Sequence, residues 1–184
     1  MFISTSGFKR MVREAYKQGL LKIAREEGTL IIRGRHWNML LDPKYLPNKE
    51  KAALIEIAGE LPDEGEQFWC EAEGNQMMVL EGRHTLPGPV KTSEYKKTEL
   101  LIDPRYRIFQ DPYSYKVVAA DAYIVDQISN VFCMDDEDPV SAPHSDGKWI
   151  QYSSMSMLLT ISTYVLDQFP YLTALEGVLI EKEN

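Results

Sequence analysis

The spacing of apolar residues predicts an amphipathic helix at the start of the chain. The apolar positions recur at intervals of three and four residues, which places them on one helical face. They are Phe8, Met11, Val12, Ala15 and Tyr16. Thr5 or Ser6 can cap this helix, and Gly19 is a suitable stop signal. We therefore predict a helix over residues 6–18.

Short apolar runs separated by turn residues predict strands and one more helix in the next part of the chain. Residues 20–34 read as two strands around a turn at Glu27-Gly28, and residues 35–42 read as a third strand. A second helix is expected where apolar residues follow "KEK", with a cap at Asn48 and a stop at Gly59. Residues 67–80 have two strand-like arms around Gly-Asn, which predicts a hairpin.

The second half of the chain has a mixed pattern. Residues 98–115 predict short strands broken by Asp-Pro steps, and residues 148–166 also predict strands. Residues 116–129 are ambiguous: their β-branched content favours a strand, whereas their length and alanines favour a helix, which we prefer. A short final helix is expected within residues 167–184.

These elements predict an α+β fold, with a mainly antiparallel sheet and two or three helices. Two prolines and two glycines make residues 81–93 a candidate linker between units at 1–80 and 94–184, although one compact domain is the alternative. Asp-Pro-basic-Tyr occurs after an apolar run at Leu40 and again at Leu101. This short repeat has two alternative explanations. It could mark two similar halves, as in sliding clamps, or it could have arisen by chance.

Composition indicates a folded protein without a membrane segment. Hydrophobic residues make up 44% of the chain, which is enough for a packed core. No apolar run approaches the roughly 18 to 20 residues that cross a bilayer, and charges at Lys9 and Arg10 interrupt any signal sequence, so we expect a cytoplasmic protein. Cys70 and Cys133 form no close pair, and we expect two free thiols rather than a zinc or redox motif.

Charge is unevenly distributed along the chain. Residues 1–60 carry eleven Lys and Arg against seven Asp and Glu, a net charge of +4. Residues 61–184 carry nine against twenty-one, a net charge of −12. The basic part could face nucleic acid or an acidic protein, and the acidic part should attract a basic protein groove.

The most acidic stretch is an unbroken run of carboxylates in "VFCMDDEDPV", formed by Asp135, Asp136, Glu137 and Asp138. It lacks the alternating ligands and the distal glutamate of a calcium loop. A two-metal site would need this run to converge with Asp42 and Asp103. The other interpretations are a solvated loop and a protein-binding surface. With Asp63, Glu64 and Glu66, such a surface could imitate the charge spacing of a phosphate backbone.

The first helix offers the opposite charge. Its cations are Lys9, Arg10, Arg13 and Lys17, and they lie mainly away from the apolar stripe. They are candidates for phosphate contacts, although no named DNA-binding motif accompanies them and a solvated helix face is the alternative.

No catalytic signature occurs in the chain. His36, His84 and His144 have no metal-ligand spacing, and "PHSDG" reads as a turn rather than a triad. Neither a nucleophile elbow nor a phosphate-binding glycine loop is present. We therefore expect no catalytic residue, no metal and no cofactor.

Two stretches, "ISTSGFKRMVREAYKQGLLKI" and "GRHWNMLLDPKYLPNKEKAALIEIAGELPDEGEQFWCEAEGNQ", resemble accessory proteins of conjugative elements and phages of Firmicutes. Some of those proteins are type II anti-CRISPR proteins. The resemblance covers less than half of the chain and carries over no residue role. It implies a non-enzymatic inhibitor that binds the Cas9–guide RNA complex and could also touch DNA.

The sequence therefore leaves several hypotheses. The preferred one is a binding protein that inhibits a nucleic-acid-processing complex. The alternatives are a DNA-binding or clamp-like replication accessory protein of a mobile element, and a small metal-dependent nuclease. A homo-oligomer that pairs its basic and acidic parts between subunits is also compatible with the charge pattern.

Overall fold

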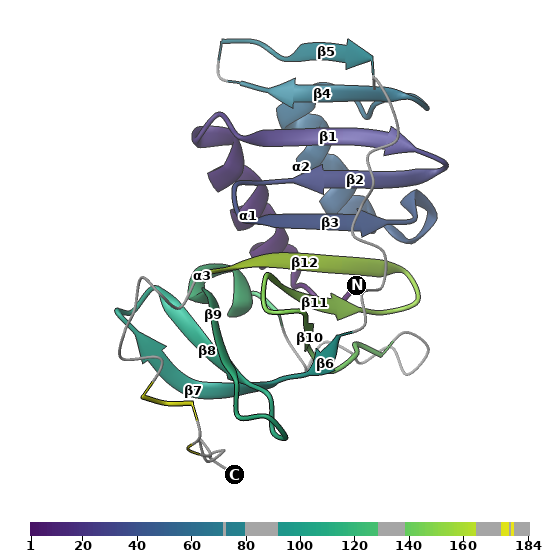
Figure 1. Cartoon of the computed structure of the whole chain (residues 1–184). Coiled ribbons are helices and arrows are strands. Elements are labelled where there is room, and N and C mark those ends of the chain that lie inside the picture. Colours follow the sequence, from purple (N-terminus) through teal and green to yellow (C-terminus); the bar gives the residue numbers. More distant parts are fainter. Residues whose placement is uncertain (72, 80–91, 129–138, 165–173, 177, 179–184) are drawn as a thin grey trace.

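The chain folds into two antiparallel sheets that share one strand, with two long helices on one side. A computed structural model describes residues 1–71, 73–79, 92–128, 139–164, 174–176 and 178 (Figure 1). The helices in this part are α1 (Thr5–Lys17), α2 (Asn48–Ala58), α3 (Ala122–Val125) and the 3-10 turn Pro43–Tyr45. The predicted α+β class is confirmed.

Strands dominate the described residues. They are β1 (Leu21–Glu26), β2 (Thr29–Arg33), β3 (Trp37–Leu41), β4 (Glu66–Cys70), β5 (Gln76–Val79), β6 (Ser93–Glu94), β7 (Lys96–Ile102), β8 (Tyr106–Gln110), β9 (Val117–Asp121), β10 (His144–Ser145), β11 (Trp149–Ser153) and β12 (Met157–Tyr164). The predicted strands over 20–34, 35–42, 98–115 and 148–166 and the hairpin over 67–80 are confirmed.

Strand β12 joins the two sheets. The first sheet has the order β5-β4-β1-β2-β3-β12-β11-β10-β6, and each neighbouring pair is antiparallel. Residues Met157–Ile161 of β12 pair with β3, whereas Thr163 and Tyr164 pair with β9. β9 then pairs with β8, and β8 pairs with β7. The second sheet therefore branches from the last residues of β12 and turns away from the first (Figure 1).

Helix α1 confirms the first prediction, because its apolar stripe is the buried face. Phe8, Met11 and Val12 are all buried against the first sheet, behind which α1 and α2 lie (Figure 1). The helix begins at residue 5, and the predicted cap is wrong: the Ser4 hydroxyl accepts a hydrogen bond from the Gly7 amide at 3.0 Å.

The second helix is confirmed, but its predicted cap is wrong. Asn48 is the first helical residue, Pro47 precedes it, and no side chain caps the helix. Gly59 ends the helix in a left-handed conformation with φ of 83°, as predicted. The turn at Glu27 and Gly28 has positive φ at both residues, which the type I′ turn of a tight hairpin requires.

The helix predicted over residues 116–129 is largely wrong. Val117–Asp121 is strand β9, and only Ala122–Val125 forms one helical turn. β9 pairs in register with all five residues of β8, from Tyr106 to Gln110. This tertiary pairing outweighs the helical propensity of the alanines, because short segments take the structure that their neighbours stabilise.

One core runs through both predicted units. The buried cluster includes Ile23 and Met39 from the first part of the chain and Leu159 from β12. The sheet and its core are therefore continuous across the predicted boundary at residues 81–93. Separate folding of the units 1–80 and 94–184 stays a prediction. The linker predicted at 81–93 falls almost wholly outside the described residues, as does most of the final helix predicted within 167–184.

The helices in the described ranges are all too short or too polar to span a membrane.

Candidate functional site

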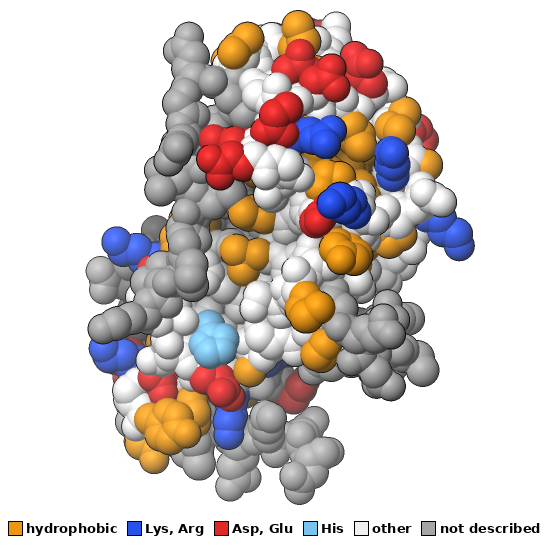
Figure 2. Space-filling model, turned by 90° about the vertical axis from the view of Figure 1, so that its right-hand side faces the viewer, with side chains coloured by type: hydrophobic (Ala, Val, Ile, Leu, Met, Phe, Trp, Pro, Cys, Tyr) orange, Lys and Arg blue, Asp and Glu red, His pale blue; other side chains and the backbone are white. Residues whose placement is uncertain are grey.

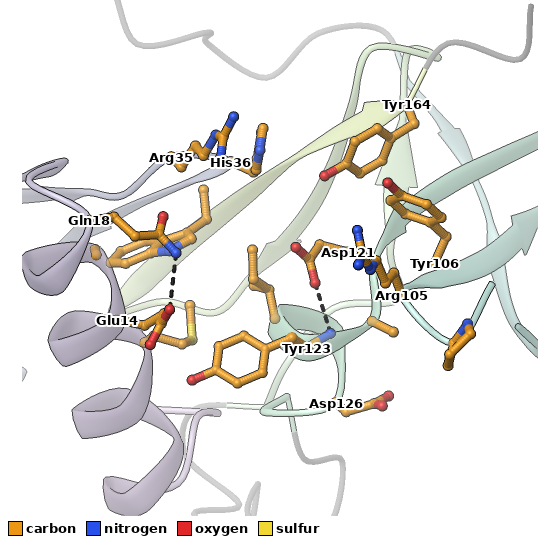
Figure 3. A pocket seen from close by; sticks show the side chains of 16 residues that line it. Glu14, Gln18, Arg35, His36, Arg105, Tyr106, Asp121, Tyr123, Asp126 and Tyr164 are labelled. Atoms are coloured by element: carbon orange, nitrogen blue, oxygen red, sulfur yellow. Dashed lines mark hydrogen bonds between the residues drawn. The ribbon is translucent and has the colours of Figure 1, made fainter. Parts of the chain in front are cut away.

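A cleft opens where the second sheet branches away from the first. It has a volume of about 740 Å³ and lies between α1, the turn from β2 to β3, and the elements β8, β9 and α3 (Figure 3). This volume is within the range of ligand-binding pockets in proteins, about 300 to 1,000 Å³.

Aromatic rings line one wall of the cleft, and Tyr164 is the central one. Its ring centroid lies 4.4 Å from that of Tyr106, at an interplanar angle of 61°. On the other side, the His36 ring lies 5.7 Å away, at 52°. The hydroxyl group of Tyr164 points into the cleft, and that of Tyr106 points toward Tyr164 (Figure 3). The wall therefore offers aromatic surface together with polar groups.

Two arginines reach the cleft from opposite sides. Arg35 comes from the turn between β2 and β3, and Arg105 from the turn between β7 and β8 (Figure 3). Both are exposed, and neither forms an ion pair with any residue that the structure describes. Burial raises the pKa of Tyr164, and so does the carboxylate of Asp121, while both arginines oppose that rise. One phenol thus lies within electrostatic range of two cations and one anion.

Asp121 lies at the floor of the cleft, at the end of β9. Its carboxylate accepts a hydrogen bond from the Tyr123 amide at 2.9 Å and so caps α3. Burial raises the pKa of Asp121, and the backbone hydrogen bonds, His36 and Arg105 oppose that rise. For His36, burial and the neighbouring Arg35 lower the pKa, whereas Asp121 opposes this shift. The neutral imidazole is therefore favoured at pH 7.

Gly34 begins the turn between β2 and β3 that carries Arg35 and His36. Its amide donates a hydrogen bond to the Trp37 carbonyl at 3.0 Å, which closes the turn before β3. A β-carbon at this position would overlap the indole ring of Trp37. Only glycine lets the ring pack against the backbone here, and Trp37 itself lines the cleft.

The predicted cationic residues lie on α1, beside the cleft rather than inside it. Arg10, Arg13 and Lys17 are exposed, and Lys9 is half-buried. Arg13 pairs with Glu56 of α2 at 3.3 Å, across the helix–helix contact. None of the four lines the cleft, although α1 contributes other side chains to it.

The predicted acidic residues Asp63 and Glu64 lie in the turn between α2 and β4, and Glu66 is the first residue of β4. Figure 2 shows acidic side chains gathered at this end of the sheet. Glu64 accepts a hydrogen bond from the Gly28 amide at 3.1 Å and lies 3.7 Å from the Arg25 guanidinium. Glu66 accepts one from the Asp63 amide at 2.9 Å. The carboxylates of Glu64 and Glu66 therefore also stabilise the turn before β4.

Other predicted residues are only partly placed. Asp135, Asp136, Glu137 and Asp138 lie outside the described residues, as do His84 and Cys133. His144 is in β10 and is paired with β6 and β11. Cys70 is a buried free thiol, and burial raises its pKa to about 11. Within the described part of the chain, no three metal-ligating side chains come together.

Sequence reasoning did not find the cleft. Arg35, Arg105, Asp121 and Tyr164 are far apart along the chain and share no motif. The one local signal was the Asp-Pro step at Asp103, which predicted the turn that presents Arg105.

Comparison with known proteins gives no family for this chain. No protein-family model matches it, and searches of curated proteins and of solved structures gave no significant match. The secondary structure and the sheet topology define the chain as an α+β protein with a mainly antiparallel sheet.

Proposed function

We propose that the protein is a non-enzymatic binding protein that inhibits a nucleic-acid-processing complex, and that the Cas9–guide RNA complex is the target to test first. The observation that carries this proposal is the rigid display of cations by α1. Phe8, Met11 and Val12 anchor the helix in the core, so Arg10 and Lys17 project from a fixed surface. Cations on a fixed helix favour phosphate contacts because the backbone that carries them loses little conformational freedom on binding.

The acidic turn supplies the second contact surface in this proposal. Asp63 and Glu64 are exposed and are carried by a turn that is hydrogen-bonded to the β1–β2 hairpin. A basic protein groove would attract such carboxylates over a distance, which gives fast and salt-sensitive association. Asp135, Asp136, Glu137 and Asp138, which lie outside the described residues, are the other acidic residues expected to contact the partner. We expect the protein to act in the cytoplasm, where its target would be found.

A cleavage assay tests the proposal directly. Purified protein is added to Cas9, guide RNA and a matched DNA target, and a pull-down with Cas9–guide RNA is run beside it. Inhibition and retention by the wild type support the proposal, whereas full cleavage with no retention rejects it.

A matched pair of variants tests the role of α1 in that assay. The double variant Arg10→Glu/Lys17→Glu should lose inhibition, because both side chains are exposed cations on the proposed contact face. The control Lys49→Glu/Lys51→Glu reverses two exposed cations on α2 and should retain it. Equal loss in both variants would mean that net charge alone matters, not the α1 surface.

The cations of α1 also favour a second candidate, a DNA-binding or clamp-like accessory protein. It would retain duplex DNA without Cas9, with an affinity that falls steeply with salt. A duplex-retention experiment between about 50 and 200 mM salt distinguishes the two candidates. Incubating the protein alone with DNA and Mg²⁺, with and without a chelator, tests the metal-dependent nuclease in the same series.

A further inference from the structure

We infer that the cleft around Tyr164 is a binding site for one nucleotide, with its base against the tyrosines and its phosphate between Arg35 and Arg105. Nucleotide chemistry requires three features in one place: a flat apolar surface, cations for the phosphate, and polar groups at the base edge. The cleft brings these features together from β12, from the two turns and from β9 (Figure 3).

The aromatic wall supplies the surface for the base. Tyr164 is half-buried and is held from both sides, by Tyr106 at 4.4 Å and by His36 at 5.7 Å. A ring fixed in this way loses little freedom when a base packs against the part of this aromatic wall that faces the cleft. Contact with aromatic side chains is the common way in which proteins hold unpaired bases. The rest of the cleft is wide enough for a ribose and a phosphate.

The two arginines supply the site for the phosphate. Arg35 and Arg105 reach the cleft from opposite sides, exposed and without ion-pair partners among the described residues (Figure 3). A guanidinium presents a planar set of donors that matches phosphate oxygens. The lining also carries the carboxylates of Glu14, Asp121 and Asp126, and Asp126 is paired with Arg107. A phosphate is therefore favoured only where both guanidinium groups can reach it.

The carboxylate of Asp121 predicts which base is preferred. One of its oxygens caps α3, and the carboxylate retains further acceptor capacity toward the cleft. Guanine carries two adjacent N–H donors on its Watson–Crick edge, whereas uracil places one donor between two carbonyl oxygens. Asp121 would accept from guanine and repel the carbonyl oxygens of uracil, so a guanine nucleotide should bind more tightly than a uracil nucleotide.

The nucleotide could be free or part of a single strand, because both present the same base and phosphate. Equilibrium binding to GMP, UMP, guanosine, ribose 5-phosphate and a short single-stranded RNA separates these sources. Fluorescence of Trp37, which lines the cleft, or calorimetry provides the readout. Tighter binding of the RNA than of GMP indicates a strand, and equal binding indicates a free nucleotide; both support the site.

Variants locate the binding within the cleft. Arg35→Gln and Arg105→Gln should each weaken GMP binding by roughly tenfold, the loss expected for one charged hydrogen-bonding partner. Both side chains are exposed, so the fold should survive, and unchanged circular dichroism checks this. The control Lys49→Gln removes an exposed cation that is not part of the cleft lining, and this variant should bind as the wild type does.

Three results would overturn the inference. They are no binding of GMP or RNA at millimolar concentration, ribose 5-phosphate binding as tightly as GMP, and equal weakening by Lys49→Gln. None of these measurements contains Cas9. The nucleotide-binding site can therefore be rejected while the proposed inhibition of Cas9 is retained, and the inhibition can be rejected while the nucleotide-binding site is retained.

Discussion

The guanidinium of Arg107 donates two hydrogen bonds to the carboxylate of Asp126, at 3.0 and 3.3 Å. The pair connects β8 to the end of α3 and so fixes the helical turn that forms one wall of the cleft. Its two partners differ in environment: the side chain of Arg107 is 10% exposed, whereas that of Asp126 is 44% exposed. Lys97 also lies near Asp126, at 3.6 Å.

This difference in exposure predicts unequal costs for removing each partner. Asp126→Ala removes the nearer carboxylate of the buried Arg107 guanidinium and leaves only that of Glu99, which is exposed and lies 3.7 Å away. We expect this variant to lower the free energy of unfolding by about 2 kcal/mol. Arg107→Met leaves a carboxylate that water can solvate, so its cost should be about 1 kcal/mol or less. Urea unfolding of both variants measures the two costs, and a larger loss in Arg107→Met would contradict this account.

Burial predicts a large contrast between two apolar residues. Phe8 is fully buried between α1 and the first sheet, whereas Met77 on β5 is 66% exposed. Phe8→Ala should lower the free energy of unfolding by about 3 to 5 kcal/mol through lost burial and a cavity. Met77→Ala should change it by no more than about 0.5 kcal/mol. Thermal or urea unfolding compares them, and a similar loss in both would mean that β5 is covered in solution.

The close approach of Trp37 to Gly34 predicts that even a methyl group is not tolerated there. Gly34→Ala should force the indole ring or the turn to shift, with a loss of about 1 to 3 kcal/mol in the free energy of unfolding. The emission maximum of the protein, to which Trp37 contributes together with Trp69 and Trp149, and the unfolding curve report the two effects. As a control, Gly147→Ala probes a glycine whose added β-carbon meets no atom within 4 Å, although its φ of 90° adds backbone strain. The stability loss should be accompanied by a spectral shift only in Gly34→Ala.

The carboxylate of Asp111 predicts a pH-dependent part of the stability. Burial opposes its ionisation, but hydrogen bonds from the Ser114 hydroxyl and from the amides of Tyr113 and Ser114 outweigh burial and hold the pKa of Asp111 below its usual value. The folded pKa is therefore lower than the unfolded pKa of about 3.9. Its stabilising contribution should be complete above about pH 5, decline below the unfolded pKa and be lost as the pH falls through the folded pKa.

Asp111→Asn provides the comparison for this pH dependence. The difference in unfolding free energy between the wild type and Asp111→Asn should be constant from about pH 5 to 7 and shrink at lower pH. Urea unfolding at a series of pH values measures it. A difference that stays constant down to about pH 2 would show that the ionised carboxylate contributes nothing to folding.

The burial of Cys70 predicts low reactivity. Burial raises the pKa of this thiol to about 11, so little thiolate exists near pH 8. In a Cys133→Ser background, an alkylating reagent should modify Cys70 only after denaturation. Rapid labelling of the folded protein at pH 8, detected by mass spectrometry, would contradict the buried position in β4.

Local pattern by itself determined most elements of this fold. The apolar stripe from Phe8 to Tyr16 predicts α1, and Glu27-Gly28 predicts the β1–β2 turn, because a helical face and a tight turn depend on neighbouring residues. The N-cap positions, Ser4 for α1 and Pro47 for α2, were missed, since several adjacent residues could serve and only the backbone geometry selects one. The exposed cations of α1 followed from the same periodicity.

Tertiary structure alone decided the path of β9 and the existence of the cleft. Val117–Asp121 is a strand because β8 and the end of β12 offer it backbone partners, which no local pattern encodes. The same branching of β12 brings Tyr164 beside Tyr106 and His36 and sets Arg35 opposite Arg105. Residues so distant along the chain meet only through strand pairing, and strand pairing depends on the whole fold rather than on any one segment.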